Sequence, residues 1–328
     1  MSTFVPTFAP TSATVVLSLL LAAAVCVGAG YLLQRTRSRW LAWSWLLGSI
    51  LIADRALRHE GAGLRMVSLV AVTLYGMKAL VGVEHHRSEA RSARRSGSGP
   101  LPLRDWLAFA VIWLGMQPRE FRTRSKLPFD RRLLVHSLAW MAAGAATIAL
   151  ARAMPANPLG TTPHLCAYTF LLGCSMITHF GIIGLIVVAL RRFGYAVSPQ
   201  FRAPWLANNL QDFWTRRWNI GFSVMTTIAI YRPLAPVVTR RVAMFAAFVA
   251  SGLLHEVACS LPVDGGFALP TLYFVMHGLA MATEHGLTRR GMPLTGVLGR
   301  VWVYAWVLLP APLVFHDAFL RGIIVPLL

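Results

Sequence analysis

Residues 242–261 read VAMFAAFVASGLLHEVACSL, and this stretch decides the fold class of the chain. About 20 mainly apolar residues are enough to cross the hydrocarbon core of a bilayer as a helix. His255 and Glu256 lie near the middle third of this run, where burying an ionisable group costs on the order of 3 kcal/mol. The segment therefore predicts a membrane helix that turns a polar site toward the protein interior.

Further apolar runs lie on both sides, and together they predict an all-α, polytopic transmembrane bundle of about eight spans. The expected spans are 13–33, 40–54, 66–83, 133–152, 165–190, 242–261, 268–287 and 301–322. Two other apolar segments are not expected to cross. Residues 104–117 are short and Trp-rich, as in an interfacial or re-entrant helix, and prolines break 220–238 at Pro233 and Pro236.

The composition agrees with a membrane protein. Hydrophobic residues make up 56% of the 328 residues and charged residues only 13%, whereas a soluble domain carries about 25% charged residues. We expect a single membrane domain, in which 1–103 form N-terminal spans with a basic loop and 104–328 form the functional core. The stretch 88–99 (SEARSARRSGSG) is expected to be a loop, because apolar spans continue on both sides.

The charges predict an orientation. There are 31 Lys+Arg against 12 Asp+Glu, and the basic residues gather in 35–39, 87–104 and 117–132. Basic loops stay cytoplasmic and favour anionic lipid headgroups, so we expect membrane lipids and not nucleic acid as partners, with the N-terminus outside. The 55–65 loop, with Arg55, Arg58 and Arg65, is an exception because this scheme places it outside.

The densest polar cluster is 208–219 (NNLQDFWTRRWN), which lies between apolar segments. Aromatic and basic residues together are typical of the membrane interface. The same residue types also suit the mouth of an internal chamber, with arginines facing an anionic ligand and an amide beside the reacting group. The composition of the segment leaves both interpretations open.

His255 has two interpretations as well. A neutral imidazole inside the membrane is what a general base requires, but it is also what a structural histidine bonded to a neighbouring helix provides. Glu256 points about 100° away on a helix of 3.6 residues per turn, so we expect it to face another partner, such as an arginine of 208–219 or another polar group.

The sequence does not favour a metal site. His179, His277, His285 and His316 also lie in or beside apolar runs, but no HExxH motif and no HxxxH pair occurs. The cysteines Cys26, Cys166, Cys174 and Cys259 form no CxxC pair, which indicates packing residues instead of disulfides or zinc ligands. We therefore expect no metal and no cofactor.

The two polar segments resemble motifs of one family. Residues 210–219 (LQDFWTRRWN) resemble the wax synthase string SLQDFWGRRWN, and 251–256 (SGLLHE) resemble its SGLxHE string, with Tyr231, Arg232 and Pro233 between them. Wax synthases are a branch of the membrane-bound O-acyltransferases, and the resemblance covers roughly 197–320. Asn209 replaces the usual Ser of the string, and Thr215 replaces its frequent Gly.

The resemblance implies a bundle with an internal chamber and a catalytic pair, His255 and Asn219. It implies acyl transfer from acyl-CoA, as cosubstrate, to a hydroxyl, with a long-chain alcohol giving a wax ester as the first expectation. A sterol, glycolipid or natural-product hydroxyl is the alternative acceptor. The residues expected to bind substrate are Gln211, Asp212, Trp214, Arg216, Arg217, Trp218, Ser251 and Glu256.

A second class of function is also compatible with this sequence. A transporter or lipid-binding membrane protein would also place polar side chains in its interior. Transporters are often built from internal repeats, and none is evident in this sequence. The concentration of polar residues in two segments, together with the resemblance, favours the enzyme.

Overall fold

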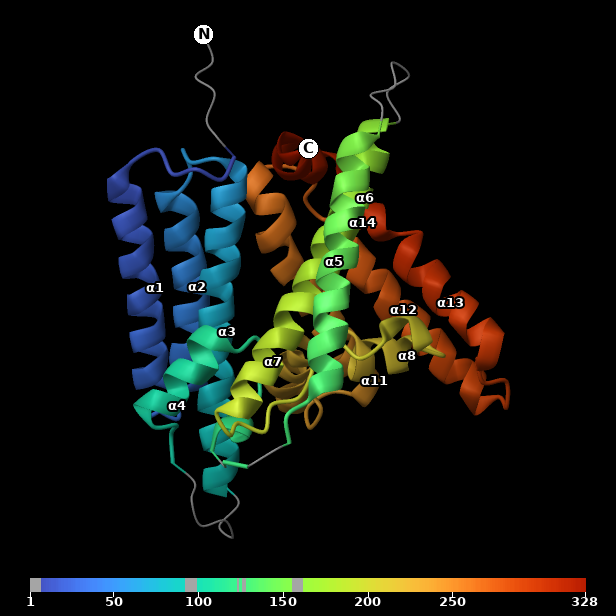
Figure 1. Ribbon diagram of the computed structural model, residues 1–328. Helices are drawn as coiled ribbons and strands as arrows, with labels where there is room; N and C mark the ends of the chain where they lie inside the picture. Colours follow the sequence, from blue (N-terminus) through green and yellow to red (C-terminus); the bar gives the residue numbers. More distant parts are fainter. Residues whose placement is uncertain (1–6, 92–98, 123, 126–127, 155–161) are drawn as a thin grey trace.

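The computed structural model describes residues 7–91, 99–122, 124–125, 128–154 and 162–328, and helices dominate throughout (Figure 1). Within these ranges there is no β-strand, and a single isolated bridge pairs Arg124 with Tyr195. The predicted all-α helical bundle is therefore confirmed.

Three antiparallel helices form the N-terminal side of the bundle, as Figure 1 shows. They are α1 (Ala13–Leu33), α2 (Arg39–Ala56) and α3 (Ala62–Arg91). Small residues allow close contact between them: a Cβ added at Gly76 of α3 would lie 3.1 Å from the Leu46 Cα of α2. Ala42 and Leu46 are buried in this contact, so α2 packs one face firmly against α3.

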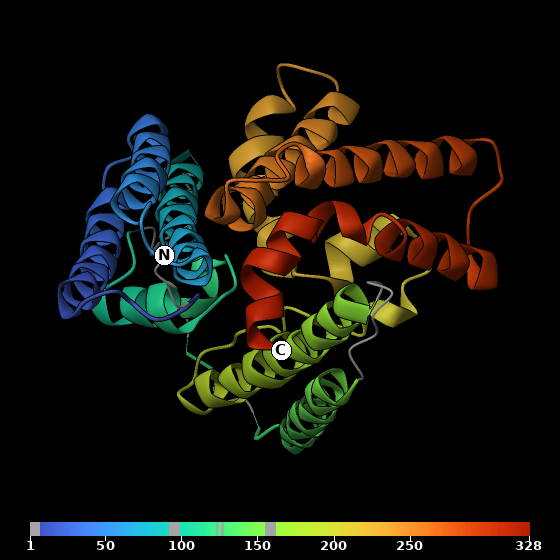
Figure 2. The same cartoon turned by 90° about the horizontal axis from the view of Figure 1, so that it is seen from above.

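The longer helices of the C-terminal side run between the same two ends (Figures 1 and 2). They are α5 (Arg131–Ala153), α6 (Thr162–Ser175), α7 (Ile183–Arg192), α11 (Arg240–His255), α12 (Leu269–Arg289) and α13 (Gly296–Leu308). The π-helical segment η3 (Met176–Ile182) joins α6 to α7, and η7 (Glu256–Ser260) extends α11 into η8 (Leu261–Val263). Each predicted span except 301–322 therefore coincides with helical segments for most of its length.

Six of these helical segments are long and apolar enough to cross a bilayer. They are Ala13–Leu33, Ala62–Ser88, Arg131–Ala153, His164–Arg192, Arg240–Val263 and Gly296–Val314. The other two predicted spans correspond to α2 and α12, which lie alongside but are less apolar. The chain is an integral membrane protein, and the count of eight crossings stays a prediction. The start of α1 and the C-terminus lie at the same end of the bundle (Figure 1), as an even number of crossings requires.

The last predicted span, 301–322, is not one helix. The helix α13 stops at Leu308, and the chain continues as α14 (Ala311–Val314), α15 (Asp317–Phe319), η9 (Leu320–Ile324) and η10 (Val325–Leu327). Pro310 and Pro312 lack the backbone N–H that a continuous helix needs. The prediction of a straight helix to residue 322 is therefore wrong.

The two segments that were expected not to cross are short helices. The first, α4 (Leu103–Leu107) with η1 (Ala108–Ile112), lies across the ends of the N-terminal helices (Figures 1 and 2). The second combines α9 (Ile220–Thr226), η6 (Thr227–Tyr231) and α10 (Arg232–Leu234), so it continues through Pro233, where a break was expected, and ends just before Pro236. Fifteen residues at 1.5 Å per residue span about 22 Å, less than the hydrocarbon core of about 30 Å.

Contacts across position 103 hold the N-terminal helices and the following segment together. The Trp106 indole Nε1 of α4 donates to the Val27 carbonyl of α1 at 2.9 Å, and Trp106 and Phe109 are fully buried. These contacts suit the expected single domain, within which the boundary between 1–103 and 104–328 remains a prediction.

Arg65 explains part of the exception in the charge pattern. Its guanidinium is buried and pairs with Asp54 at 3.0 Å and with Asp264 at 2.8 Å. It also donates to the Pro262 carbonyl at 3.1 Å. The loops 55–65 and 262–267 therefore lie at the same end of the bundle, and the Arg65 charge is compensated inside the protein.

Candidate active site

The 208–219 segment folds as a compact turn of helix that α12 holds in place. It contains the short helix α8 (Leu210–Asp212) and the π-helical turn η5 (Phe213–Arg217). The Glu284 carboxylate of α12 accepts the backbone N–H of Leu210 at 2.7 Å and that of Gln211 at 3.3 Å. An acidic side chain at the start of a helix satisfies N–H groups that have no partner within the helix.

The sequence interpretation missed Glu284. Glu284 is buried on an otherwise apolar helix, and a carboxylate in that setting normally has a specific partner. That signal was available in the sequence, but the partner was not, because Leu210 lies 74 positions earlier in the chain.

The two arginines of the motif have different surroundings. Arg217 Nε donates to Asp212 Oδ2 at 2.6 Å, and its Nη1 donates to the Ala203 carbonyl at 3.2 Å. Arg216 and Gln211 are exposed, and neither side chain forms a hydrogen bond with any residue that the structure describes. Arg217 and Asp212 therefore stabilise the turn, whereas Arg216 and Gln211 are free to meet a ligand.

Asn219 is held in an unusual backbone conformation at the end of the motif. Its φ of 43° and ψ of 58° are left-handed, a region that Asn tolerates better than most residues. The flanking backbone is fixed, since the Ile220 N–H donates to the Gln200 carbonyl at 3.0 Å. The Asn219 Oδ1 accepts the N–H of Phe222 at 3.3 Å and caps α9, while the side chain remains exposed.

A buried lysine supports this corner from α3. Lys78 is completely buried, and its Nζ donates to the carbonyl of Phe109 at 2.9 Å and to the carbonyl of Gly115. Gly115 in turn lies against the start of α9, because a Cβ added at Gly221 would be 2.9 Å from the Gly115 Cα. Lys78 thus fixes the loop at Gly115. Gly221, two residues after Asn219, packs against this loop.

His255 stands at the junction of α11 and η7. Its Nδ1 lies 2.7 Å from the Ser251 carbonyl oxygen, which can only accept a hydrogen bond. In the neutral imidazole the hydrogen is therefore on Nδ1, and Nε2 carries a lone pair. The ring packs at 4.3 Å from Phe274 and 5.6 Å from Phe222, measured between centroids.

Phe222 connects the two residues of the expected catalytic pair. Its backbone N–H is bonded to the Asn219 side chain, and its ring packs against the His255 imidazole. Asn219 therefore contacts the backbone of Phe222, and His255 contacts its ring. This arrangement places both near the start of α9, although they belong to different helices.

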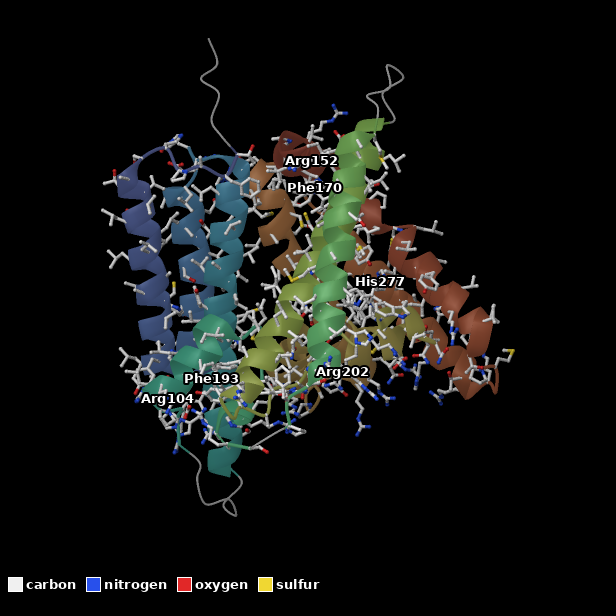
Figure 3. All side chains as sticks on the ribbon, in the orientation of Figure 1. Arg104, Arg152, Phe170, Phe193, Arg202 and His277 are labelled. Atoms are coloured by element: carbon white, nitrogen blue, oxygen red, sulfur yellow. The ribbon has the colours of Figure 1, made fainter. Side chains whose placement is uncertain are left out.

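Two other described histidines also bond through Nδ1 to the carbonyl four residues earlier, so the environment of Nε2 distinguishes the three. His277 donates to the Tyr273 carbonyl at 2.9 Å and His136 to the Arg132 carbonyl at 2.8 Å. His277, labelled in Figure 3, is fully buried, and its Nε2 is sealed without a partner among the described residues. His136 is exposed, whereas His255 is half-buried and its Nε2 is not sealed by packing.

Glu256 faces a polar partner away from His255, as expected, and that partner is Thr271 instead of an arginine of the motif. Its Oε1 accepts the Thr271 backbone N–H at 3.0 Å and the Thr271 hydroxyl at 2.7 Å, at the start of α12. The free N–H groups at that helix terminus are a better partner for a carboxylate than an arginine on a distant loop. The Ser251 hydroxyl is buried and donates to the Ala247 carbonyl at 2.8 Å.

The two tryptophans of the motif face different neighbours. Trp214 points inward, with its ring 5.7 Å from Phe274 and 5.3 Å from His277. Trp218 stacks on Phe213 at 5.7 Å and contacts His179 at 5.3 Å. Trp214 therefore belongs to the same cluster as His255, with Phe274 between them. Within the described ranges no group of three His, Cys, Asp or Glu is arranged to hold a metal ion.

The comparisons with known proteins point to one family. Residues 197–276 match the model of the membrane bound O-acyl transferase family. The long-chain-alcohol O-fatty-acyltransferase of Simmondsia chinensis is 34% identical over 185 residues, which cover 48% of this chain and 49% of that protein. The probable long-chain-alcohol O-fatty-acyltransferase 7 of Arabidopsis thaliana is 31% identical over 171 residues, covering 47% of this chain and 48% of that protein.

A shorter match is to a protein whose name gives a different acyl acceptor. The acyl-CoA–sterol O-acyltransferase 1 of Arabidopsis thaliana is 40% identical over 67 residues, which cover 18% of this chain and 19% of that protein. The chain spans about half the length of the two long-chain-alcohol relatives. The similarity confirms the predicted resemblance to wax synthase-like membrane-bound O-acyltransferases, and the family segment contains both Asn219 and His255.

Proposed function

We propose, from the wax synthase-like character of residues 197–276, that this chain transfers a fatty acyl group from acyl-CoA to a hydroxyl inside the membrane. A long-chain alcohol is the proposed acceptor and a wax ester the product. The relatives named as long-chain-alcohol O-fatty-acyltransferases support this choice. The match to the sterol O-acyltransferase makes a sterol the second acceptor class to test.

The observation that carries the proposal is the tautomer of His255. Its Nδ1 hydrogen is committed to the Ser251 carbonyl at 2.7 Å, so Nε2 is the basic atom, and packing does not seal it. An alcohol is a weak nucleophile until a base removes its proton. A neutral imidazole in a half-buried position can take that proton without first losing one of its own.

The proposed reaction has one direct displacement. The alcohol O–H gives its proton to His255 Nε2 while its oxygen attacks the thioester carbonyl carbon. The C–S bond then breaks, the imidazolium returns the proton to the departing sulfur, and free CoA and the ester remain. No covalent acyl-enzyme is required, since the Ser251 hydroxyl is buried and donates to the Ala247 carbonyl.

Asn219 supplies the second function. Its Oδ1 accepts the Phe222 N–H, so the amide nitrogen is left with two hydrogens that can donate. A donor fixed beside the reacting carbonyl stabilises the negative charge that develops on its oxygen. The left-handed backbone at Asn219 aims this amide from the exposed corner of the motif.

The basic end of the bundle is the proposed site of the CoA head. Arg202, Arg216 and Arg217 belong to the motif region, and Arg216 is exposed without an ion pair to a described residue. Figure 3 shows Arg104 and Arg202 toward this end and Arg152 toward the other. The charge of the arginine-rich loops predicts that they face the cytoplasm. Acyl-CoA, the acyl donor, occurs on that side, so its phosphates would approach these arginines from there.

Purified full chain in vesicles, supplied with radiolabelled palmitoyl-CoA and a panel of alcohols and sterols, tests the proposal. New radiolabelled ester that depends on His255 is the expected result. His136→Ala is a matched control, because His136 makes the same Nδ1 contact on an exposed helix face. Movement of unmodified alcohol or acyl-CoA across the vesicle without ester formation would overturn the enzyme and support the transporter alternative.

A further inference from the structure

A groove between α1, α3 and α4 lies apart from the motif region, and neither the motif nor the family match accounts for it. It encloses about 400 Å³ and is lined by side chains of α1, α3, α4 and η1. This volume lies within the range of roughly 300–1,000 Å³ that is usual for small-molecule sites. On α1 the lining runs from Ala23 to Tyr31, a length of about 12 Å at 1.5 Å per residue.

Two glycines of α1 have opposite roles in shaping this groove. A Cβ added at Gly30 would lie 2.6 Å from the Trp106 ring, so Gly30 permits the close approach of α4. Gly28 lines the groove, and a Cβ there would have no neighbour within 4 Å. The Trp106 indole is fixed by its hydrogen bond to Val27, so packing shapes the wall and Gly28 leaves the space open.

The groove is apolar along its walls, and a cationic side chain, Arg35, lies one helical turn beyond its last α1 residue, Tyr31. Arg35 lies over the Tyr31 ring, with its Cζ 3.7 Å from the ring centroid, and its Nη1 donates to the Tyr31 carbonyl at 2.6 Å. Arg35 is exposed and forms no ion pair with a residue that the structure describes. The guanidinium is therefore held over the ring of Tyr31, which lines the groove, with most of its N–H donors unused.

Other polar groups nearby suit the interfacial region of a lipid. The hydroxyls of Tyr31 and Tyr75, which line the groove, form no hydrogen bond within the described part of the chain. Tyrosine at the membrane interface typically combines an apolar ring with a hydroxyl at headgroup depth. Arg104 follows Leu103 of the groove wall, and Figure 3 shows it at the arginine-rich end.

We infer that this groove binds an anionic phospholipid. One acyl chain would lie along Gly28 and Leu107, the glycerol ester region would meet the tyrosine hydroxyls, and the phosphate would meet Arg35. An anionic headgroup complements the unpaired arginine, whereas a zwitterionic headgroup brings its own cation to the same place. The site goes beyond the proposed acyl transfer and does not depend on it.

Photo-crosslinking with a diazirine-bearing phosphatidylglycerol tests the inference on the full chain in phosphatidylcholine vesicles. We expect wild-type protein to be labelled at α1 and α4, and labelling to fall at least tenfold in Gly28→Leu, whose side chain fills the open space. Gly48→Leu is the matched control, because Gly48 also has no neighbour within 4 Å but lies on α2 outside the groove. Arg35→Gln should abolish the preference for phosphatidylglycerol over a phosphatidylcholine probe.

Three results would overturn the inference, of which two concern the lipid probes and the Gly28→Leu variant. One is equal wild-type labelling by the two lipid probes, and the other is unchanged labelling in Gly28→Leu. Labelling that palmitoyl-CoA or a long-chain alcohol removes, but excess phosphatidylglycerol does not, would assign the groove to a substrate and also overturn it. Because the measurement reads lipid contact and not turnover, a failure of the acyl-transfer proposal leaves this test unaffected.

Discussion

The Nδ1 atom of His255 lies 2.7 Å from the carbonyl oxygen of Ser251, one helical turn earlier. This contact fixes which nitrogen of the imidazole is basic. Ser251 contributes its carbonyl to the histidine and donates its hydroxyl hydrogen to the Ala247 carbonyl.

His255→Ala should remove the general base from the proposed acyl transfer. General-base catalysis contributes roughly 10²–10⁴-fold to a rate, so we expect kcat for ester formation to fall by about that factor. The measurement is radiolabelled ester formation in vesicles, with melting temperature as a check of folding. His136→Ala should keep wild-type activity. Retention of most activity in folded His255→Ala would remove His255 from the mechanism.

Asn219→Asp should separate the capping role of Asn219 from its role as a donor. Asp caps helices about as well as Asn, so the melting temperature should stay near wild type. The carboxylate has no hydrogen to donate and adds negative charge beside a developing oxyanion, so we expect kcat to fall by roughly 10²–10³-fold. Asn219→Ala should lose a similar rate and also about 1 kcal/mol of stability, the usual value of a cap. Full activity in the Asp variant would contradict the donor role.

The two neighbouring arginines should respond differently to the same change. Arg216→Gln should raise the KM for acyl-CoA several-fold at unchanged melting temperature, and the defect should shrink at high salt because ions screen exposed charges. Arg217→Gln breaks the partly buried bond to Asp212, and a charged hydrogen bond of this kind contributes about 1.5–3 kcal/mol. It should therefore lower the melting temperature. A lower melting temperature in Arg216→Gln, with only a raised KM in Arg217→Gln, would show that the Arg217–Asp212 bond does not stabilise the turn.

Lys78→Met should disturb the site from a distance. The substitution keeps the length of the side chain but leaves the Phe109 and Gly115 carbonyls without their donor, at about 1–3 kcal/mol for each unsatisfied group. We expect a lower melting temperature and a lower kcat, because the loop at Gly115 supports Gly221 beside Asn219. Thr73→Val on the same helix is the control, since its buried hydroxyl has no partner among the described residues. Equal behaviour of both variants would exclude a specific role for Lys78.

The Arg65–Asp264 pair should make stability depend on pH. The Arg65 guanidinium holds the pKa of Asp264 below its ordinary value. A depressed carboxyl pKa adds stability above its unfolded value of about 3.9, and that stability is lost as the pH falls through the lower folded value. Asp264→Asn should therefore melt below wild type at pH 6–7, and the difference should vanish as the pH falls below about 4. A difference that persists at low pH would mean that packing, and not the charge, is what the substitution changes.

Much of this protein follows from local sequence. Runs of apolar residues predicted the positions of the helices, because a segment must hide its backbone polar groups from lipid and a helix does so within itself. The strings at 210–219 and 251–256 were enough to predict the family resemblance, whereas the catalytic pair Asn219 and His255 stays a prediction. Proline predicted the end of the helix before Pro236, but its effect at Pro310 was overlooked in the span 301–322.

Tertiary structure alone decided which partners meet. Glu256 caps α12 at Thr271, Glu284 holds the start of the motif, and Arg65 finds Asp264 from 199 positions away. Hydropathy and motif strings describe each residue among its neighbours in the chain, whereas a buried charge selects its partner from whatever the packing of distant helices brings within hydrogen-bonding reach. The open space at Gly28 arises in the same way, from the crossing of α1 and α4, and no single stretch of sequence contains it.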